Sequence, residues 1–423
     1  MTHSPPHSAA ATSTGALAGL RILDLSRVLA GPWASQILGD LGAEVIKVEH
    51  PGRGDDTRAW GPPFVTDGDG PDNSFSAYYL SCNRNKRSVA VDMANFEGAA
   101  LIRRLAAGSD ILIENFKVGG LLKYGLDYGS LKAANPGLVY CSITGFGQDG
   151  PYAARGGYDF LIQGMGGLMS TTGLAEGRPG SEPTKIGIPV ADLFTGLYAT
   201  IAIQAALRHR ERTGRGQHID CALLDTATAV LANHGASWMV AGIVARPMGN
   251  AHSTVVPYRT FAVSDGHVIV AVGNDSQFRA LCGLLDRPDL SDDVRYATNA
   301  GRLANRLELE VQIESETIKR SRDKLLSDMV SAGVPGGPIN NVDQVFADPQ
   351  VKARGMVELH ETRSGGELAM TRFPARLSDT PATIRCLPPR LGEHTEEILS
   401  QILNLSLEEI ARLRATGAIA GQE

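Results

Sequence analysis

Short apolar segments alternate with helical patterns through the first half of this chain of 423 residues, and this alternation restricts its fold most. The patterns predict strands at residues 21–25, 44–48, 111–113 and 138–143, with helices at 35–41 and 97–107 between them. Strands joined through helices pair in parallel and are covered by helices on both faces. We therefore expect an α/β fold with a Rossmann-like large domain. No Gly-x-Gly-x-x-Gly follows the first strand, so a dinucleotide fingerprint is missing.

The pattern changes after about residue 210, which suggests a second domain. A charged and glycine-rich exit near 212–216 precedes a helical run at 222–240, strands at 258–263 and 267–272, and charged helices over 275–333. We expect residues 17–210 to form the first part of the large domain, 211–224 a linker and 225–335 a smaller α+β domain. Residues 1–16 are mostly small and polar and predict a disordered tail.

Composition excludes several classes of function. The net charge is −6 with both signs interspersed, and no run of about 18 apolar residues occurs, so we expect neither a nucleic-acid nor a membrane partner. Five cysteines without close pairs indicate reduced thiols, with no disulfide frame and no metal site. The chain is expected to be soluble and cytoplasmic.

Asp192 is the most informative single residue. Apolar residues recur after it at helical spacing, which places its carboxylate at a helix start. One interpretation is a helix N-cap, the commonest role of Asp there. The other is a nucleophile that the positive helix end keeps ionised. The segment alone leaves both open.

Five further segments, taken in order, resemble one family. They are the run 20–49, which includes Arg27-Val28-Leu29-Ala30-Gly31-Pro32, and then Asn83–Ser88, Glu114–Phe116, Thr144–Pro151 and Leu391–Thr395. From about Leu17 onward the chain resembles the class III CoA-transferases, the family of formyl-CoA transferase and carnitine CoA-transferase. In that family, the Asp aligned with Asp192 is the acyl-accepting nucleophile.

The resemblance also implies an architecture. Residues 336–423 return to the large domain, and two chains form a homodimer in which they interlock as rings.

It further implies that acyl-CoA and a small carboxylic acid are the partners, with coenzyme A as part of the substrate and no permanently bound cofactor. The positions that line CoA match Val28, Leu29, Ala30, His50, Val91, Ala94, Asn115, Phe116 and Lys123, with Arg27 and Lys117 beside them. His50 departs from the basic residue of the family, so Arg53 or Arg58 is expected to contact phosphate instead.

The resemblance places Tyr158, Asp159 and Gln163 beside the nucleophile. Backbone N–H groups that stabilise an oxyanion are expected at 166–167 or at Gly249 and Asn250, although ordinary turns explain these glycines equally well. Segments 249–258, 273–278 and 334–341 are similar to the branch of succinyl-CoA:glutarate CoA-transferase, which handles short dicarboxylates. The candidates for binding a second substrate carboxylate are His252, Ser253 and Arg259.

The main alternative is a 2-methylacyl-CoA racemase of the same superfamily. That branch moves an α-proton with a histidine and a second carboxylate, and these positions are Tyr158 and Ala262 here. A proton shuttle lacking both groups is disfavoured. A non-enzymatic scaffold would leave Asp192 as a helix cap only.

Overall fold

The computed structural model describes residues 15–66 and 74–420, so the expected tail lies almost wholly outside the described residues. The chain divides into two compact units. The larger unit contains the chain up to Leu168, Ile186–Ala236 and the part from Ala353 onward, and the smaller unit contains Met169–Lys185 and Ser237–Lys352. The C-terminal residues therefore belong to the larger unit.

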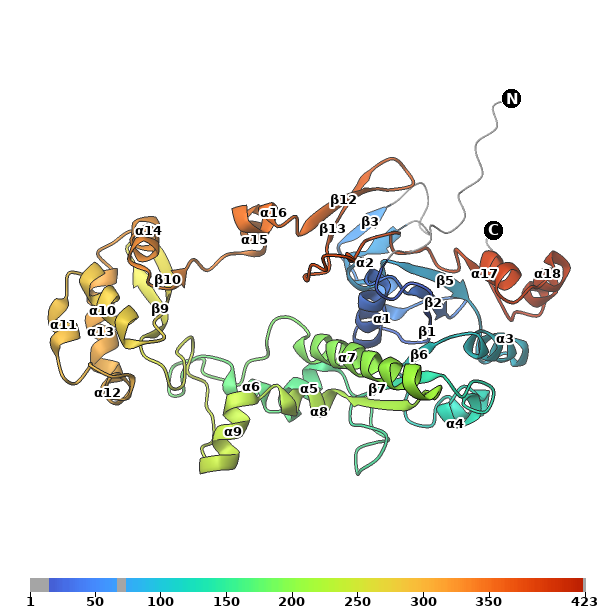
Figure 1. Cartoon of the computed structure of the whole chain (residues 1–423), viewed down its shortest axis with the longest axis horizontal. Coiled ribbons are helices and arrows are strands. Elements are labelled where there is room, and N and C mark those ends of the chain that lie inside the picture. The colour runs from blue at the N-terminus through green and yellow to red at the C-terminus, as the bar shows by residue number, and fades with distance from the viewer. Residues whose placement is uncertain (1–14, 67–73, 421–423) are drawn as a thin grey trace. The chain divides into compact units, whose positions relative to one another are not determined.

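A six-stranded parallel sheet forms the centre of the larger unit (Figure 1). Its strands are β1 (Arg21–Asp24), β2 (Glu44–Glu49), β5 (Lys86–Ala90), β6 (Ile111–Glu114), β7 (Val139–Thr144) and β8 (His218–Ala222). Their order in the sheet is β5-β2-β1-β6-β7-β8, so the direction of winding reverses between β1 and β6. In open parallel sheets, ligands bind beyond the carboxyl ends of the strands at such a reversal.

Alternating side chains send two hydrophobic layers to opposite faces of this sheet. Ile22, Ile111 and Val139 pack with α1 (Ala30–Asp40) and α7 (Val190–Thr213). Their neighbours Leu23, Leu112 and Tyr140 pack with α3 (Phe96–Ala107), α17 (Thr395–Gln401) and α18 (Leu407–Ala415). The expected α/β fold with a parallel sheet is confirmed, because strands covered on both faces are what the apolar segments predicted.

Helix α7 packs closely on α1 through small residues and exposes several of its large apolar ones. A Cβ atom on Gly196 would lie 2.7 Å from the carbonyl oxygen of Ala30, so glycine permits the close contact with α1. Leu197 and Ile201 are 41 and 63 % exposed. Helical spacing predicted the helix, and Leu207 faces the core as expected, but Leu197 and Ile201, which also defined it, do not. By length and composition α7 is also long enough to cross a membrane, and half of its most apolar stretch is buried within the fold.

Two expectations about segments were wrong. The predicted linker at 211–224 contains the edge strand β8, and the predicted helix at 222–240 is two helices, α8 (Leu223–Ala229) and α9 (Ala232–Ala241). Strand β8 lies at the edge of the sheet, where His218 and Asp220 are exposed to solvent. These polar residues interrupt the apolar pattern by which a buried strand is recognised in the sequence. Strand β5 begins with Lys86 and Arg87, which also concealed it.

The smaller unit is α+β. Its antiparallel sheet contains β9 (Tyr258–Val263), β10 (Gly266–Ala271) and β11 (Gly336–Gly337), in the order β11-β10-β9. Its helices are α10 (Asp275–Leu284), α11 (Pro288–Asp292), α12 (Asn299–Ala304), α13 (Arg306–Thr317), α14 (Arg322–Ala332), α15 (Val342–Ala347) and most of α16 (Pro349–Ala353). Its apolar core is separate from those of the larger unit and includes Phe261 and Phe278.

The remaining elements are short. They are η1 (Asp56–Ala59), β3 (Phe64–Thr66), β4 (Ser74–Ser76), α2 (Ala77–Cys82), η3 (Leu122–Tyr124), α4 (Tyr128–Leu131), α5 (Asp159–Met165), α6 (Leu168–Thr171), β12 (Val357–Glu361) and β13 (Glu367–Thr371).

Fully buried ions tie the first strands together. The Lys47 ammonium on β2 lies 2.8 Å from a carboxylate oxygen of Asp55 and donates to the carbonyl oxygen of Ser26 at 2.9 Å. The Lys86 ammonium on β5 lies 3.2 Å from a carboxylate oxygen of Asp24. Burial by itself would lower the pKa of Lys47, but Asp55, Asp24 and Glu49 outweigh it and raise that pKa. The ammonium is therefore charged inside the fold.

Replacing Lys47 by Met should destabilise the larger unit strongly. The substitution leaves the Asp55 carboxylate buried without its cation, and breaking a buried pair in this way typically costs about 3–5 kcal/mol. Denaturant unfolding should show this loss. Arg208→Met is the control, because the Arg208–Glu211 pair is 74 and 62 % exposed and such pairs contribute little. Equal stabilities of the two variants would contradict the structural role of Lys47.

Candidate active site

Two cavities lie in the larger unit and share Arg27, Phe116 and Gly120 in their walls. The Asp192 cavity has a volume of about 560 Å³, and its lining includes Asp192, Tyr158 and the end of β7. The His50 cavity has a volume of about 410 Å³, and its lining includes His50, Lys47 and the segment from Val91 to Ala94. Both lie where residues after β1 and β6 meet, at the reversal in the sheet.

The nine positions expected to line CoA, and Arg27 beside them, all border one or both cavities. The His50 cavity contains His50, Val91, Ala94 and Lys123, the Asp192 cavity contains Val28, Leu29, Ala30 and Asn115, and Arg27 and Phe116 border both. These residues come from four separate segments of the chain. The structure therefore brings together a set of residues that only the family resemblance had connected.

The turn from Arg27 to Ala30 is held from two sides. The side-chain amide of Asn115 accepts from the Arg27 N–H at 2.9 Å and donates to the Arg27 carbonyl oxygen at 2.6 Å. The Asp55 carboxylate accepts from the Val28 N–H at 3.2 Å. Val28 has a φ of 72°, a strained value for a β-branched residue. These bonds fix an unfavourable backbone conformation where the two cavities meet.

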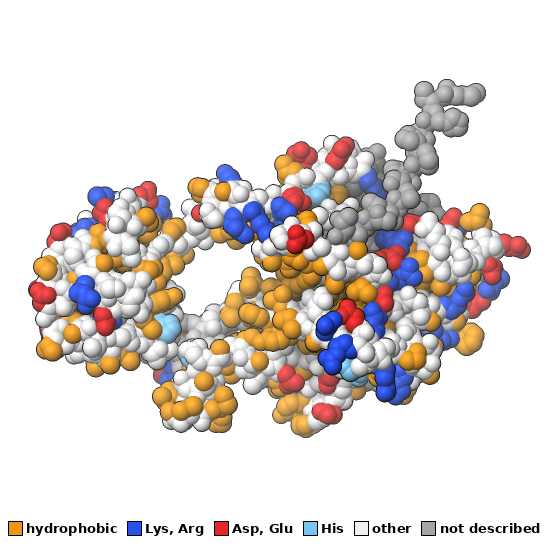
Figure 2. All heavy atoms as spheres, in the orientation of Figure 1, with side chains coloured by type: hydrophobic (Ala, Val, Ile, Leu, Met, Phe, Trp, Pro, Cys, Tyr) orange, Lys and Arg blue, Asp and Glu red, His pale blue; other side chains and the backbone are white. Residues whose placement is uncertain are grey.

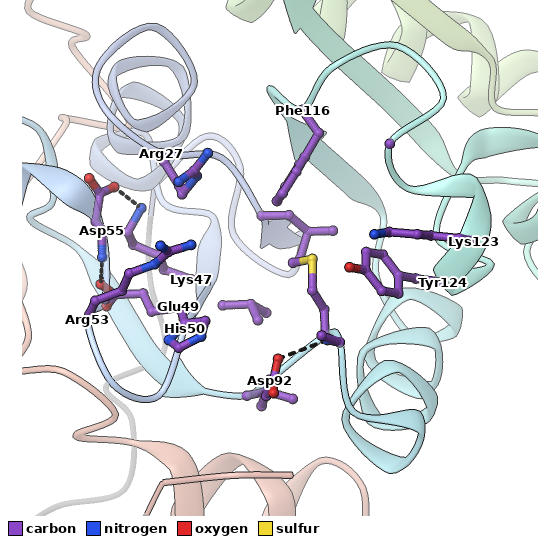
Figure 3. Close-up of a pocket in the computed structure, with 17 residues that line it drawn as sticks. Arg27, Lys47, Glu49, His50, Arg53, Asp55, Asp92, Phe116, Lys123 and Tyr124 are labelled. Carbon is purple, nitrogen blue, oxygen red and sulfur yellow. Dashed lines mark hydrogen bonds and ion pairs between the residues drawn. The ribbon is translucent and has the colours of Figure 1, made fainter. Parts of the chain in front are cut away.

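The cations of the His50 cavity differ in whether their charge is already paired within the protein. Lys47 is paired with Asp55, whereas Arg53 and Lys123 are exposed and approach from opposite sides of the cavity (Figure 3). Of the two arginines expected to replace the basic residue of the family, Arg53 lines this cavity. Arg58 does not: its guanidinium pairs with Glu49 at 2.7 Å and stacks on Tyr79. Arg53 is the better candidate for contacting a phosphate.

Asp192 does not cap its helix. It is the third residue of α7, and Asp159 provides the cap instead. One carboxylate oxygen of Asp159 accepts from the N–H groups of Ala191 at 2.8 Å and Asp192 at 3.3 Å, and the other accepts from the Gln163 amide at 2.7 Å. Gln163 is fully buried and accepts from the Ile186 N–H at 2.8 Å. Asp159 and Gln163 thus hold the start of α7 against α5.

The Asp192 carboxyl is left available. No donor among the described residues lies within hydrogen-bonding distance of it. Burial, and then the negative charge of Asp159, raise its pKa to about 7. One interpretation was that the helix end keeps this group ionised, but burial and the neighbouring carboxylate favour its protonated form. A carboxyl poised near neutral pH in a cavity is typical of a functional group.

Two glycines allow a close backbone approach in the wall of this cavity. A Cβ atom on Gly145 would lie 2.5 Å from the Cα atom of Gly157, so the residues after β7 lie directly against those before α5. Tyr158 and Asp159 follow immediately, which is how the end of β7 positions them. The glycines expected to supply oxyanion donors, Gly166 and Gly167, instead end α5 and are absent from the described lining of the cavity.

The loop expected to bind a second carboxylate lies in the smaller unit, where its polar groups contact each other. The Gly249 N–H donates to the Gly173 carbonyl oxygen, and the Asn250 amide donates to the Thr260 hydroxyl at 3.2 Å. The His252 ring accepts from two backbone N–H groups of its own loop, those of Thr254 and Val255.

Of the remaining candidates, Ser253 lies in the same loop and Arg259 lies on β9, and both have contacts within the smaller unit. The Ser253 carbonyl oxygen accepts from Arg306 at 3.3 Å. The Arg259 guanidinium pairs with the buried Glu310 at 2.8 Å. This internal pair makes Arg259 a poor candidate for binding a substrate carboxylate.

Sequence reasoning missed Arg155 and Tyr78. Arg155 lines the Asp192 cavity. The sequence signal that could have identified it is its position two residues before Gly157, in the segment that leads to Tyr158 and Asp159. Burial, and then the charge of Asp192, raise the pKa of Tyr78, so its phenol remains protonated at neutral pH. Tyr78 lies on α2, and nothing in the sequence connects α2 with Asp192. No group of three or more His, Cys, Asp or Glu within residues 15–66 and 74–420 could hold a metal ion.

Comparison with known proteins identifies the family. The family model described as CoA-transferase family III matches residues 17–395. The chain belongs to this family. It is therefore a CoA-transferase, and the class III resemblance is confirmed.

Named relatives and a solved structure agree. The chain is 51 % identical to succinate–glutarate CoA-transferase of Agrobacterium fabrum (strain C58), over 91 % of this chain and 95 % of that protein. It is 43 % identical to human succinyl-CoA:glutarate CoA-transferase, over 96 % of this chain and 90 % of that protein. A crystal structure of a CaiB/BaiF family protein from Brucella suis superposes with a TM-score of 0.80 at 52 % identity, covering 92 % of this chain and 99 % of that one.

The raised pKa of Asp192 predicts the pH dependence of this CoA-transferase. Its ionised fraction increases about tenfold for each pH unit below about 7 and levels off above, so kcat/KM for the acyl-CoA should follow the same curve. Asp159→Asn removes the neighbouring charge while keeping an oxygen acceptor, so the midpoint should move to lower pH. Asp225→Asn, in the first turn of α8 and outside both cavities, should leave the midpoint unchanged. An unaltered midpoint in Asp159→Asn would rule out this electrostatic coupling.

Proposed function

We propose that this CoA-transferase moves CoA from succinyl-CoA to a short dicarboxylic acid such as glutarate, and that Asp192 carries the acyl group in between. The observation that carries the proposal is the position of Asp192. Its carboxyl lacks a described hydrogen-bond donor and lies in a cavity that shares a wall with the CoA positions. The names of the two relatives support succinyl-CoA and glutarate as the substrates.

Asp192 supplies the covalent chemistry. Its carboxylate attacks the thioester carbonyl of succinyl-CoA, which forms a mixed anhydride and releases CoA thiolate. The thiolate then attacks the aspartyl carbonyl of the anhydride, which releases succinate and leaves an aspartyl-CoA thioester. The acceptor carboxylate displaces the thiolate to form a second anhydride. Attack of the thiolate on the acceptor acyl carbonyl gives the new acyl-CoA and frees Asp192. Thioester is exchanged for thioester, so no ATP is needed.

The surrounding residues have matching roles. The cationic ends of Arg53 and Lys123 provide charge for the CoA phosphates in the His50 cavity (Figure 3). Tyr78, which stays protonated, donates to the oxyanion formed at each addition, together with backbone N–H groups of the glycine-lined wall. Asp159 keeps Asp192 in place through the backbone.

The racemase alternative lacks its proton carriers in this structure. Tyr158 is 70 % exposed and occupies the histidine position, and a phenol is a poor replacement for an imidazole as a general base. Ala262 on β9 occupies the position of the second acid. Neither side chain removes an α-proton at neutral pH, so transfer through Asp192 is the chemistry that these residues support.

Asp192→Asn should abolish transfer while the protein stays folded. If Asp192 were a cap, losing it would cost ~1 kcal/mol. A carboxyl with a raised pKa instead weakens the fold as the pH rises from 3.8 to about 7, because the folded state holds the proton more tightly than the unfolded state. The melting temperature of Asp192→Asn at pH 8 should therefore equal or exceed that of the unchanged protein. Near-normal turnover would exclude Asp192 as the nucleophile.

The covalent intermediate provides the direct test. After incubation with succinyl-CoA, hydroxylamine should modify a peptide containing Asp192, because an acyl anhydride or thioester on that side chain is electrophilic. Asp225→Asn should be labelled like the unchanged protein, and Asp192→Asn should not be labelled. Label on a cysteine alone would indicate a different mechanism.

We also propose that the enzyme is a homodimer. Large apolar side chains are exposed on α7 of the larger unit, including Ile201, and on Trp238, Met239 and Val240 of the smaller unit. Figure 2 shows hydrophobic side chains gathered over the end of α9. Exposed groups of large apolar side chains mark interfaces. Light scattering should give twice the chain mass of 44.8 kDa, and Ile201→Asp should reduce the dimer, whereas Arg208→Asp on the same helix should not. A monomer for the unchanged protein would overturn this proposal.

The cytoplasm remains the proposed location.

A further inference from the structure

We propose that Arg155 binds the distal carboxylate of the acyl group and so selects dicarboxylic over monocarboxylic acids. This inference rests on the proposed function and adds the residue that determines substrate class. Arg155 and Asp192 line the same cavity, together with Tyr158 and the two glycines between Arg155 and Tyr158. Asp159, four residues after Arg155, accepts a hydrogen bond from the backbone of Asp192. Arg155 is therefore only four residues from Asp159, whose carboxylate contacts the backbone of Asp192.

Aromatic rings orient the Arg155 guanidinium. Its central carbon lies 5.0 Å from the centre of the Phe146 ring and 4.7 Å from the centre of the Tyr152 ring. The two rings meet edge to face at 5.5 Å, and Phe146 is buried. A guanidinium that stacks on aromatic faces keeps its N–H groups in its own plane, where a carboxylate accepts two parallel hydrogen bonds.

The charge of Arg155 is not used within the described fold. No carboxylate among the described residues pairs with it, and the one polar contact that its side chain makes with them is weak, at 3.9 Å to the sulfur of Met165. Arg27, in the same cavity, is paired with Asp56 at 2.8 Å. Arg155 therefore contributes an unneutralised cation to the wall of the cavity that contains Asp192, and a second carboxylate on the substrate supplies the missing anion.

Lys117 is the other cation of this cavity without a described carboxylate partner. It belongs to the loop 115–120, which also borders the His50 cavity through Phe116 and Gly120. Its position is therefore on the CoA side of the Asp192 cavity, whereas Arg155 belongs to the segment that leads into Tyr158 and Asp159. This difference makes Lys117 a matched control.

The experiment is a competition between two acceptors of equal length. The enzyme is given succinyl-CoA with equal concentrations of glutarate and pentanoate, and the ratio of glutaryl-CoA to pentanoyl-CoA is measured by mass spectrometry. Both acids compete for the same aspartyl-CoA thioester, so the ratio does not depend on the donor half of the reaction. The unchanged enzyme should favour glutarate by roughly ten- to a hundredfold. Arg155→Met should reduce this ratio by most of that factor, and Arg155→Lys should keep part of it.

The outcomes separate the two proposals. Lys117→Met should raise KM for succinyl-CoA and leave the product ratio unchanged. Transfer with a strong glutarate preference that survives in both Arg155 variants would overturn the role of Arg155 and leave the proposed function intact. Transfer by the unchanged enzyme without any preference would overturn the dicarboxylate proposal and this inference together. Because Arg155 is exposed, both variants should fold, which circular dichroism verifies.

Discussion

The ion pair of Lys47 and Asp55 is the interaction on which both cavities depend. It is fully buried, it binds β2 to the turn after β1 through the carbonyl oxygen of Ser26, and its carboxylate also holds the strained Val28. A charge buried this deeply is stable only with its partner in place. The cost of separating the pair keeps the first strands and the turn that joins the cavities in one arrangement.

The carboxylate of Asp159 controls both the hydrogen bonding at the start of α7 and the protonation of Asp192. Asp159 satisfies the N–H groups at the start of α7, a role that would otherwise have required the side chain of Asp192. The same negative charge, together with burial, raises the pKa of Asp192 to about 7. Asp159 thus leaves Asp192, the proposed nucleophile, out of the helix cap and adjusts its protonation.

In the smaller unit, polar residues expected to bind substrate contact other residues of the protein instead. His252 and Arg259 have the side chains that a dicarboxylate site needs, yet their hydrogen bonds and ion pair are completed by Thr254, Val255 and Glu310. Arg155, which was not expected, stacks on two rings and has no described carboxylate partner. Whether a cation is available for a ligand depends on its neighbours in space, and those neighbours are distant in the sequence.

The sequence by itself determined the parallel α/β fold, because alternating apolar strands and helices have few ways to bury both faces of a sheet. Its ordered motifs also identified Asp192 and the ten residues around the two cavities. Only the tertiary structure decided the rest. It showed the strands β5 and β8, whose polar residues are paired or lie at the sheet edge. It also showed that Leu197 and Ile201 of α7 face outward. It also showed that Asp159, and not Asp192, caps α7. These features depend on hydrogen bonds, burial and charge pairs between segments that are distant in the sequence, whereas a sequence pattern describes one segment.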